Sequence, residues 1–217
     1  MLQSNTGSAR NGKWNPFIFS GTINRTMMLF SAEDPLEDIF RIVKNELQRG
    51  ALDPIHPFRF LSLASHTDSD IDVRYVVLRK LDEEMNLFFF TDYRSTKVRQ
   101  LKNKPDAALL FYHPGERVQV RIKGKIEIYH QNDISRSFWS TIQGDAQKAY
   151  NAITPPGEII PDPRTAYNWP TEMDDRFFCL IKVIPIHIEA LQIHGLNHIR
   201  VVFQKKKDNW EMDWLAP

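Results

Sequence analysis

The sequence has little of several features that define large classes of proteins. It contains one cysteine, Cys179, so an intrachain disulfide is impossible, which fits a reducing compartment. No apolar stretch approaches the roughly 20 residues of a membrane-spanning helix, and the longest apolar runs are 87–90 and 107–112. Basic residues exceed acidic ones by 28 − 27 = 1, which excludes a polybasic nucleic-acid binder. We therefore expect a cytoplasmic protein that binds neither membranes nor nucleic acids.

Several familiar catalytic motifs are also missing. The sequence has no G-x-G-x-x-G, no Walker phosphate loop and no G-x-S-x-G nucleophile turn. His187, His194 and His198 lie close together in the sequence, but without H-E-x-x-H spacing or cysteine partners. We expect a structural or surface role for at least two of these histidines and no metal site.

The remaining composition is that of an ordinary soluble globular protein, with 42% hydrophobic and 25% charged residues. Residues 1–32 contain no acidic residue and many small polar ones, which a transit peptide can also show. This segment lacks an Arg-rich amphipathic helix and an apolar signal core. We therefore expect 1–33 to be a disordered extension, or a start placed ahead of Met27 or Met28, and 34–217 to be one folded domain.

Helical periodicity occurs in three places. Asp34 can cap a helix that has Pro35 in its first position and stops at Gly50, because apolar residues recur at helical spacing between them. A short helix is predicted over 96–103, and 131–150 is predicted to be helical with a break near Gly144.

Strand patterns dominate the rest of the chain. The expected strands are 58–65, 73–80, 87–91, 107–112, 117–129 with a bend at Gly124, 176–193, 198–204 and 210–215. The run 87–91 is apolar on both faces, so protein must cover both. Residues 154–175 are rich in Pro, Asp and Thr and indicate an ordered surface loop. Antiparallel strands with a few helices favour a barrel or a tightly curved sheet in the α+β class.

One group of residues indicates an anion site. Ser95 opens the helix 96–103, Lys97 lies in its first turn, and Arg94 and Arg99 flank it, with Arg74 on an earlier strand. Cations at a helix N-terminus are locally unfavourable, but they suit a bound phosphate, which the free N–H groups there also attract. A solvated cationic turn explains the same residues equally well.

Several stretches from residue 74 onward share patterns with one known family. Residues 74–79 (Arg-Tyr-Val-Val-Leu-Arg) are similar to a strand Arg-x-x-Leu-Leu-Lys, and 89–97 (Phe-Phe-Thr-Asp-Tyr-Arg-Ser-Thr-Lys) to a turn Phe-Tyr-Thr-Asn-Tyr-x-Ser-Arg-Lys. Segments 107–112 and 117–124 match the next two strands, and 214–217 matches the C-terminal ending. The chain therefore resembles the pyridoxamine 5′-phosphate oxidase-like FMN-binding split-barrel superfamily.

The resemblance implies an antiparallel split β-barrel with peripheral helices, forming a homodimer that binds FMN in clefts at the subunit interface. It assigns the FMN phosphate to Arg74 and Lys97, and a hydrogen bond to the flavin to Gln119. The full set that it assigns to the cofactor is Arg74, Arg79, Phe90, Thr91, Ser95, Thr96, Lys97, Gln119 and Arg200. His198 is carried over as a contact to a small-molecule substrate.

The sequence also departs from the family pattern. Thr96 replaces an arginine, Leu191 a flavin-contacting tryptophan and Leu196 a substrate-contacting arginine. The positions of the tyrosine, arginine and serine that bind the substrate phosphate are filled by Ser137, Thr141 and Asp145. An aspartate repels a phosphate, so the resemblance implies a retained cofactor site and a lost vitamin-substrate site.

Spacing raises a separate question about the cofactor site. Arg74 and Arg79 lie five positions apart on one expected strand, so they fall on opposite faces unless a bulge intervenes.

We therefore expect an FMN-dependent oxidoreductase of unknown substrate, in which hydride passes to flavin N5. The alternatives are authentic pyridoxamine or pyridoxine 5′-phosphate oxidase activity, a non-catalytic flavin-binding module with FMN or another planar ligand such as haem, and a scaffold with a decayed site.

Overall fold

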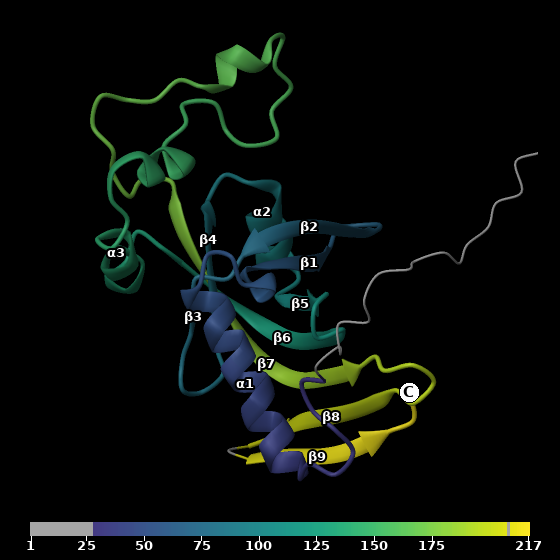
Figure 1. The fold of residues 1–217 in the computed structure, drawn as a ribbon. Helices are drawn as coiled ribbons and strands as arrows, with labels where there is room; N and C mark the ends of the chain where they lie inside the picture. The colour runs from purple at the N-terminus through teal and green to yellow at the C-terminus, as the bar shows by residue number, and fades with distance from the viewer. Residues whose placement is uncertain (1–27, 208) are drawn as a thin grey trace, which may run out of the picture.

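A computed structural model describes residues 28–207 and 209–217 and shows an antiparallel sheet of nine strands (Figure 1). The strands are β1 (Phe60–His66), β2 (Ile71–Val77), β3 (Lys80–Leu81), β4 (Leu87–Asp92), β5 (Asp106–His113), β6 (Val118–His130), β7 (Phe178–Gln192), β8 (Ile199–Lys206) and β9 (Asn209–Leu215). The helices are α1 (Leu36–Leu52), α2 (Thr96–Asn103) and α3 (Asp133–Trp139), with 3₁₀ helices η1 (Pro57–Arg59), η2 (Gly144–Tyr150) and η3 (Pro163–Ala166). The α+β prediction is confirmed.

Two long strands, β6 and β7, organise the sheet. β7 pairs with β6 along its length, with β4 through its first half and with β8 through its second half. The register shifts between Lys123 and Gly124, where a Cβ on Gly124 would lie 2.7 Å from the Ile184 carbonyl oxygen. The bend predicted at Gly124 is confirmed, and this close approach explains why the position requires glycine.

Strand β4 is covered on both faces, as its apolar sequence predicts. Leu87 and Phe89 belong to the main core beneath α1. Phe88 and Phe90 turn the other way, into a second cluster with Phe138 of α3. Alternate residues of a strand point to opposite faces, so β4 separates two layers of protein, with α1 in one and α3 with η2 in the other (Figure 1).

The predicted ends of the first helix are wrong in detail. Pro35 is the N-cap of α1, and the Asp34 carboxylate instead accepts from the Ser31 N–H at 2.7 Å. The helix continues through Gly50 to Leu52. A Cβ on Gly50 would lie 2.7 Å from Phe58 Cβ, so this glycine permits the close approach of η1 rather than ending the helix.

The region 131–150 divides at Gly144 as predicted, into α3 and η2, and 154–175 is a long connection with η3 as its regular element (Figure 1). Most of the expected extension, 1–27, lies outside the described residues, and Phe30 just beyond it is 2% exposed in the core. Across the part of the chain that the structure describes, the helices are too short or too polar to cross a bilayer.

Candidate functional site

Four of the predicted cofactor residues converge where α2 begins. Lys97 Nζ donates to Thr91 Oγ1 at 3.0 Å, and Thr91 Oγ1 lies 3.4 Å from Ser95 Oγ. Arg74 approaches from β2 and donates to Gln100 Oε1 of α2 at 2.9 Å. Ser95 is the N-cap but makes no side-chain hydrogen bond to the first turn, which contains no acidic residue. The first N–H groups of α2 are therefore available to an anion.

The electrostatics of this group fit a phosphate ester. Burial, and then the neighbouring Arg74 guanidinium, lower the pKa of Lys97. Two cations held together away from water are stabilised by a bound anion. Nearby Asp92 is already engaged by Arg94, through Oδ1 at 3.1 Å and Oδ2 at 2.6 Å. Charge-assisted donors from two elements and free helix N–H groups are the donor set that the FMN phosphate requires.

Two other cations of the predicted anion site have different positions. Arg94 donates to the carbonyl oxygens of Ala152 and Ile153 and lies over the Phe177 ring, so it anchors the long connection. Arg99 is exposed. Thr96, in the first position of α2, is also exposed, and a Cβ on Gly157 would lie 3.9 Å from its Oγ1. The long connection therefore passes beside the start of α2.

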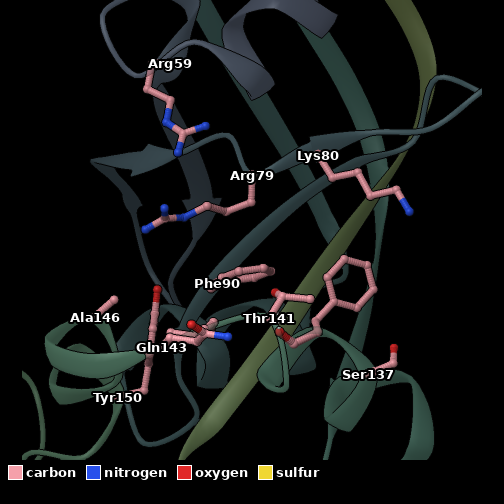
Figure 2. A pocket seen from close by; sticks show the side chains of 11 residues that line it. Arg59, Arg79, Lys80, Phe90, Ser137, Thr141, Gln143, Ala146 and Tyr150 are labelled. Carbon is pink, nitrogen blue, oxygen red and sulfur yellow. Dashed lines mark hydrogen bonds between the residues drawn. The ribbon is translucent and has the colours of Figure 1, made fainter.

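Arg79 and Phe90 do not join this group. They line a cavity of about 590 Å³ on the other side of β4 (Figure 2). Figure 2 shows Arg59 and Arg79 on one side of this cavity, Tyr150 and Gln143 on the other, and the Phe90 ring between them. The Arg79 guanidinium lies 5.6 Å from the centre of the Phe90 ring. Arg79 therefore lies apart from Arg74, as their spacing predicts, but β2 ends at Val77 and Arg79 stands between β2 and β3 rather than on the same strand.

The cavity is cationic and aromatic. Arg59, Arg79 and Lys80 line it, and none of its lining residues is acidic. Burial and then the Arg79 charge lower the pKa of Arg59, so the two guanidinium groups oppose each other. Burial raises the pKa of Tyr150, and the Arg79 cation opposes that shift. Such a cavity suits a planar molecule that carries an anionic group.

Asp145, expected at the position of a substrate-phosphate ligand, does not line the cavity. Its exposed carboxylate pairs with Lys148 Nζ at 2.8 Å. Ser137 and Thr141 do line it, but their hydroxyls donate to the carbonyl oxygens of Ile134 and Phe138. Helix α3 and the residues just after it therefore bring no charged side chain to the cavity. Its cations are Arg59 of η1, Arg79 and Lys80 of β3. Arg59 had no sequence signal, because its role depends on where η1 packs.

Gln119 and Arg200 form a third group, on the outer face of the sheet. Gln119 of β6 is paired with Leu191 of β7, and Leu191 with Arg200 of β8. Arg200 is held by Glu189, at 3.0 Å from Nε and 2.5 Å from Nη2. His198 is exposed just before β8, and its Nδ1 accepts from the His194 N–H at 3.3 Å. One chain thus does not bring these residues to Arg74 and Lys97.

Glu189 is the centre of an ion network on that face. Burial alone would raise its pKa, but hydrogen bonds from His187, Arg200 and Arg121 outweigh it and lower the pKa to about 2. Arg121 and Glu189 occupy the row of the sheet that also contains Leu110. The network therefore borders the apolar part of the same face.

A separate cluster contains side chains of the types that ligate metal ions. Glu46, His56 and His113 place their ligand atoms within 4.8 Å of one another. His56 Nδ1 accepts from the Phe58 N–H at 3.1 Å, and His113 Nδ1 accepts from the Glu116 N–H at 3.0 Å. Both rings therefore carry their proton on Nε2, and His56 donates it to Glu46 at 3.0 Å. A hydrogen bond therefore joins α1 to the start of η1, and the His113 ring of β5 packs against His56 with 5.5 Å between the ring centres.

Comparisons with known proteins identify a family and a fold that this chain resembles. Residues 40–130 match the family described as pyridoxamine 5′-phosphate oxidase, FMN-binding domain. A pyridoxine/pyridoxamine 5′-phosphate oxidase from Vesicomyosocius okutanii is 27% identical over 169 residues, which cover 72% of this chain and 78% of the relative. The Burkholderia mallei enzyme of the same name is 39% identical over 80 residues, or 37% of each chain.

Two solved structures share the fold. A pyridoxamine 5′-phosphate oxidase-related FMN-binding protein from Nostoc punctiforme has a TM-score of 0.69 at 21% identity, covering 86% of this chain and all of that one. PhzG from Burkholderia lata, in complex with tetrahydrophenazine-1-carboxylic acid, has a TM-score of 0.68 at 17% identity, covering 85% and 95%. With the family match to residues 40–130, these likenesses confirm the predicted resemblance to the pyridoxamine 5′-phosphate oxidase-like split-barrel superfamily.

Proposed function

We propose that this protein is a homodimeric FMN-dependent oxidoreductase that acts on a small anionic molecule. The observation that carries the proposal is the convergence of Arg74, Lys97, Thr91 and Ser95 at the start of α2. Residues from two strands and one helix meet there with a surplus of hydrogen-bond donors, which favours binding of a phosphate ester.

In this proposal the chain binds and orients the cofactor. Arg74, Lys97 and the first N–H groups of α2 would hold the phosphate. Bound FMN would supply a two-electron acceptor, with hydride arriving at flavin N5. Phe90 and Thr91 lie on opposite sides of β4. The strand therefore separates the proposed phosphate-binding residues from the cavity.

The cavity defines the proposed substrate class. Arg59 and Arg79 would bind a phosphate or carboxylate, and the Phe90, Phe138 and Tyr150 rings would contact a planar body. The structural relative from Burkholderia lata was solved with a carboxylic acid of this kind, tetrahydrophenazine-1-carboxylic acid, which supports an anionic substrate.

The outer face of the sheet supports a dimer. Val73 and Tyr75 of β2 are 60% and 75% exposed, and Leu110 and Tyr112 of β5 are 40% and 47% exposed. A contiguous exposed apolar face of this kind favours an interface. Gln119 lies opposite Tyr112 on the same face, so a second copy would bring its own face, with Arg200 of the partner subunit, to the cofactor. Light scattering should then give twice the chain mass of 25.4 kDa.

The proposal is tested by the visible spectrum of the purified protein and by titration with FMN, read as quenching of flavin fluorescence. We expect a yellow protein, or saturable quenching by a colourless one. A colourless protein without saturable binding would refute the proposal.

The second candidate is oxidation of pyridoxamine or pyridoxine 5′-phosphate itself. The position of Asp145, paired with Lys148 outside the cavity, favours it, because the expected repulsion of a substrate phosphate is absent. Turnover of pyridoxine 5′-phosphate with oxygen consumption would establish this activity. FMN binding without turnover, or with turnover of another anionic donor, would leave the broader proposal.

A further inference from the structure

Arg74 has a carboxylate neighbour that competes with a bound phosphate. Asp72 lies two residues before Arg74 on β2, on the same face, and the two form an ion pair. A hydrogen bond from Gln100, followed by that from Arg74, lowers the pKa of Asp72, so the carboxylate is charged at neutral pH. Asp72 carries no signal in the sequence, because its importance depends on where Arg74 points.

Arg74 does not need Asp72 to keep its position. Its Nη1 donates to Ser65 Oγ at 2.5 Å, and its Nη2 donates to Gln100 Oε1 at 2.9 Å. Ser65 and Gln100 are 2% and 8% exposed, so these two partners are fixed in the core. The Asp72 side chain is 45% exposed, whereas that of Arg74 is 18% exposed. The carboxylate therefore lies at the rim, over a guanidinium that other groups already orient.

The charges at the site also indicate that Asp72 opposes the binding of a phosphate. Arg74 and Lys97 together carry two positive charges, and Asp72 cancels one of them. Asp92 does not change this count, because Arg94 pairs with it. A dianionic phosphate ester bound to Arg74 and Lys97 would repel the Asp72 carboxylate and would compete with it for Arg74 Nη2.

We propose that Asp72 limits the affinity of this protein for FMN by occupying Arg74 in the absence of the phosphate. The inference rests on the proposed function and concerns the same site. It describes a protein tuned to bind its cofactor less tightly than its cations alone would allow.

The test is the dissociation constant of FMN for wild type and Asp72→Asn, measured by quenching of flavin fluorescence. The amide keeps the shape of the side chain and removes its charge. We expect FMN to bind about tenfold more tightly, equivalent to about 1.4 kcal/mol. Riboflavin, which lacks the phosphate, should bind equally to both proteins. Asp70→Asn is the matched control, because Asp70 is exposed on the same hairpin and its carboxylate accepts from the Ile71 N–H.

A double-mutant cycle shows whether Asp72 acts through Arg74. In an Arg74→Ala background, Asp72→Asn should change the FMN dissociation constant much less than in wild type. Unchanged or weaker FMN binding by Asp72→Asn would overturn the inference and, if weaker, would make Asp72 a support for Arg74. If neither wild type nor Asp72→Asn quenched FMN fluorescence, the proposed function would fail and the inference with it.

Discussion

The two groups of cations on either side of β4 differ in how their charges are compensated. Arg74 and Lys97 are surrounded by hydroxyl, amide and carboxylate partners. Arg59 and Arg79 face a cavity with aromatic walls and no acidic lining residue. The charges of the first group are therefore compensated by neighbouring side chains, whereas those of the second group face an open cavity. Consecutive residues of one strand, Phe90 and Thr91, serve different groups because a strand alternates its faces.

The largest effect should come from removing the cations of the first group. Arg74→Ala combined with Lys97→Ala should weaken FMN binding by roughly 3–6 kcal/mol, because each charge-assisted hydrogen bond contributes about 1.5–3 kcal/mol. Fluorescence titration measures this loss. Riboflavin affinity should change far less. The double variant Lys125→Ala, Lys206→Ala removes two lysines from exposed ion pairs and should leave FMN binding unchanged. Equal losses for FMN and riboflavin would contradict the phosphate assignment.

Two neighbouring residues of β4 allow the contributions of the core and of the cavity to stability to be compared. Phe89 is fully buried, so Phe89→Ala should lower the free energy of unfolding by about 3–5 kcal/mol. Phe90 is half-buried in the cavity wall, so Phe90→Ala should cost less stability. Urea unfolding monitored by circular dichroism compares the two. A larger loss for Phe90→Ala would show that the cavity is part of the core.

Arg79→Ala should separate the two cation groups by function. We expect weaker binding of pyridoxine 5′-phosphate, by about 1.5–3 kcal/mol if one charge-assisted contact is lost, with the FMN dissociation constant unchanged. Calorimetric titration of the FMN-loaded protein with pyridoxine 5′-phosphate measures the first quantity, and titration of the FMN-free protein with FMN measures the second. Arg41→Ala, which removes an exposed cation of α1, is the control. A comparable loss of FMN affinity in Arg79→Ala would show that the two groups of cations belong to one binding site.

The smallest effect concerns the contribution of Glu189, the partner of Arg200, to the stability of the fold. Glu189 has a lowered pKa of about 2, against an ordinary value of 4.5, so it stabilises the fold above pH 4.5. This contribution is lost as the pH falls from 4.5 toward 2. Glu189→Gln should therefore lower Tm at pH 7, and the difference from wild type should shrink across that acidic range. Thermal unfolding followed at several pH values tests this, and a constant difference would exclude the ion network as its source.

The sequence was sufficient for features that composition or spacing reveals, even where their packing partners lie far along the chain. The helix 96–103, the bend at Gly124 and the double coverage of 87–91 follow from periodicity, from glycine and from apolar content, and the structure contains all three. The ends of α1 did not follow, because a tertiary contact of Gly50 with Phe58 allows the helix to continue. The group of residues at the start of α2 could be found from the sequence, because Thr91, Ser95 and Lys97 lie within seven positions of one another.

By itself the sequence determined the fold class, the family resemblance and the cationic turn at Ser95, since each depends on residues close together or on patterned strands. Only the tertiary structure decided that Arg79 lines a cavity and that Arg59 joins it there from η1. The physical reason is that charges act through space. Their partners come from strand parity and from helices that pack across the sheet, and sequence spacing does not contain those distances.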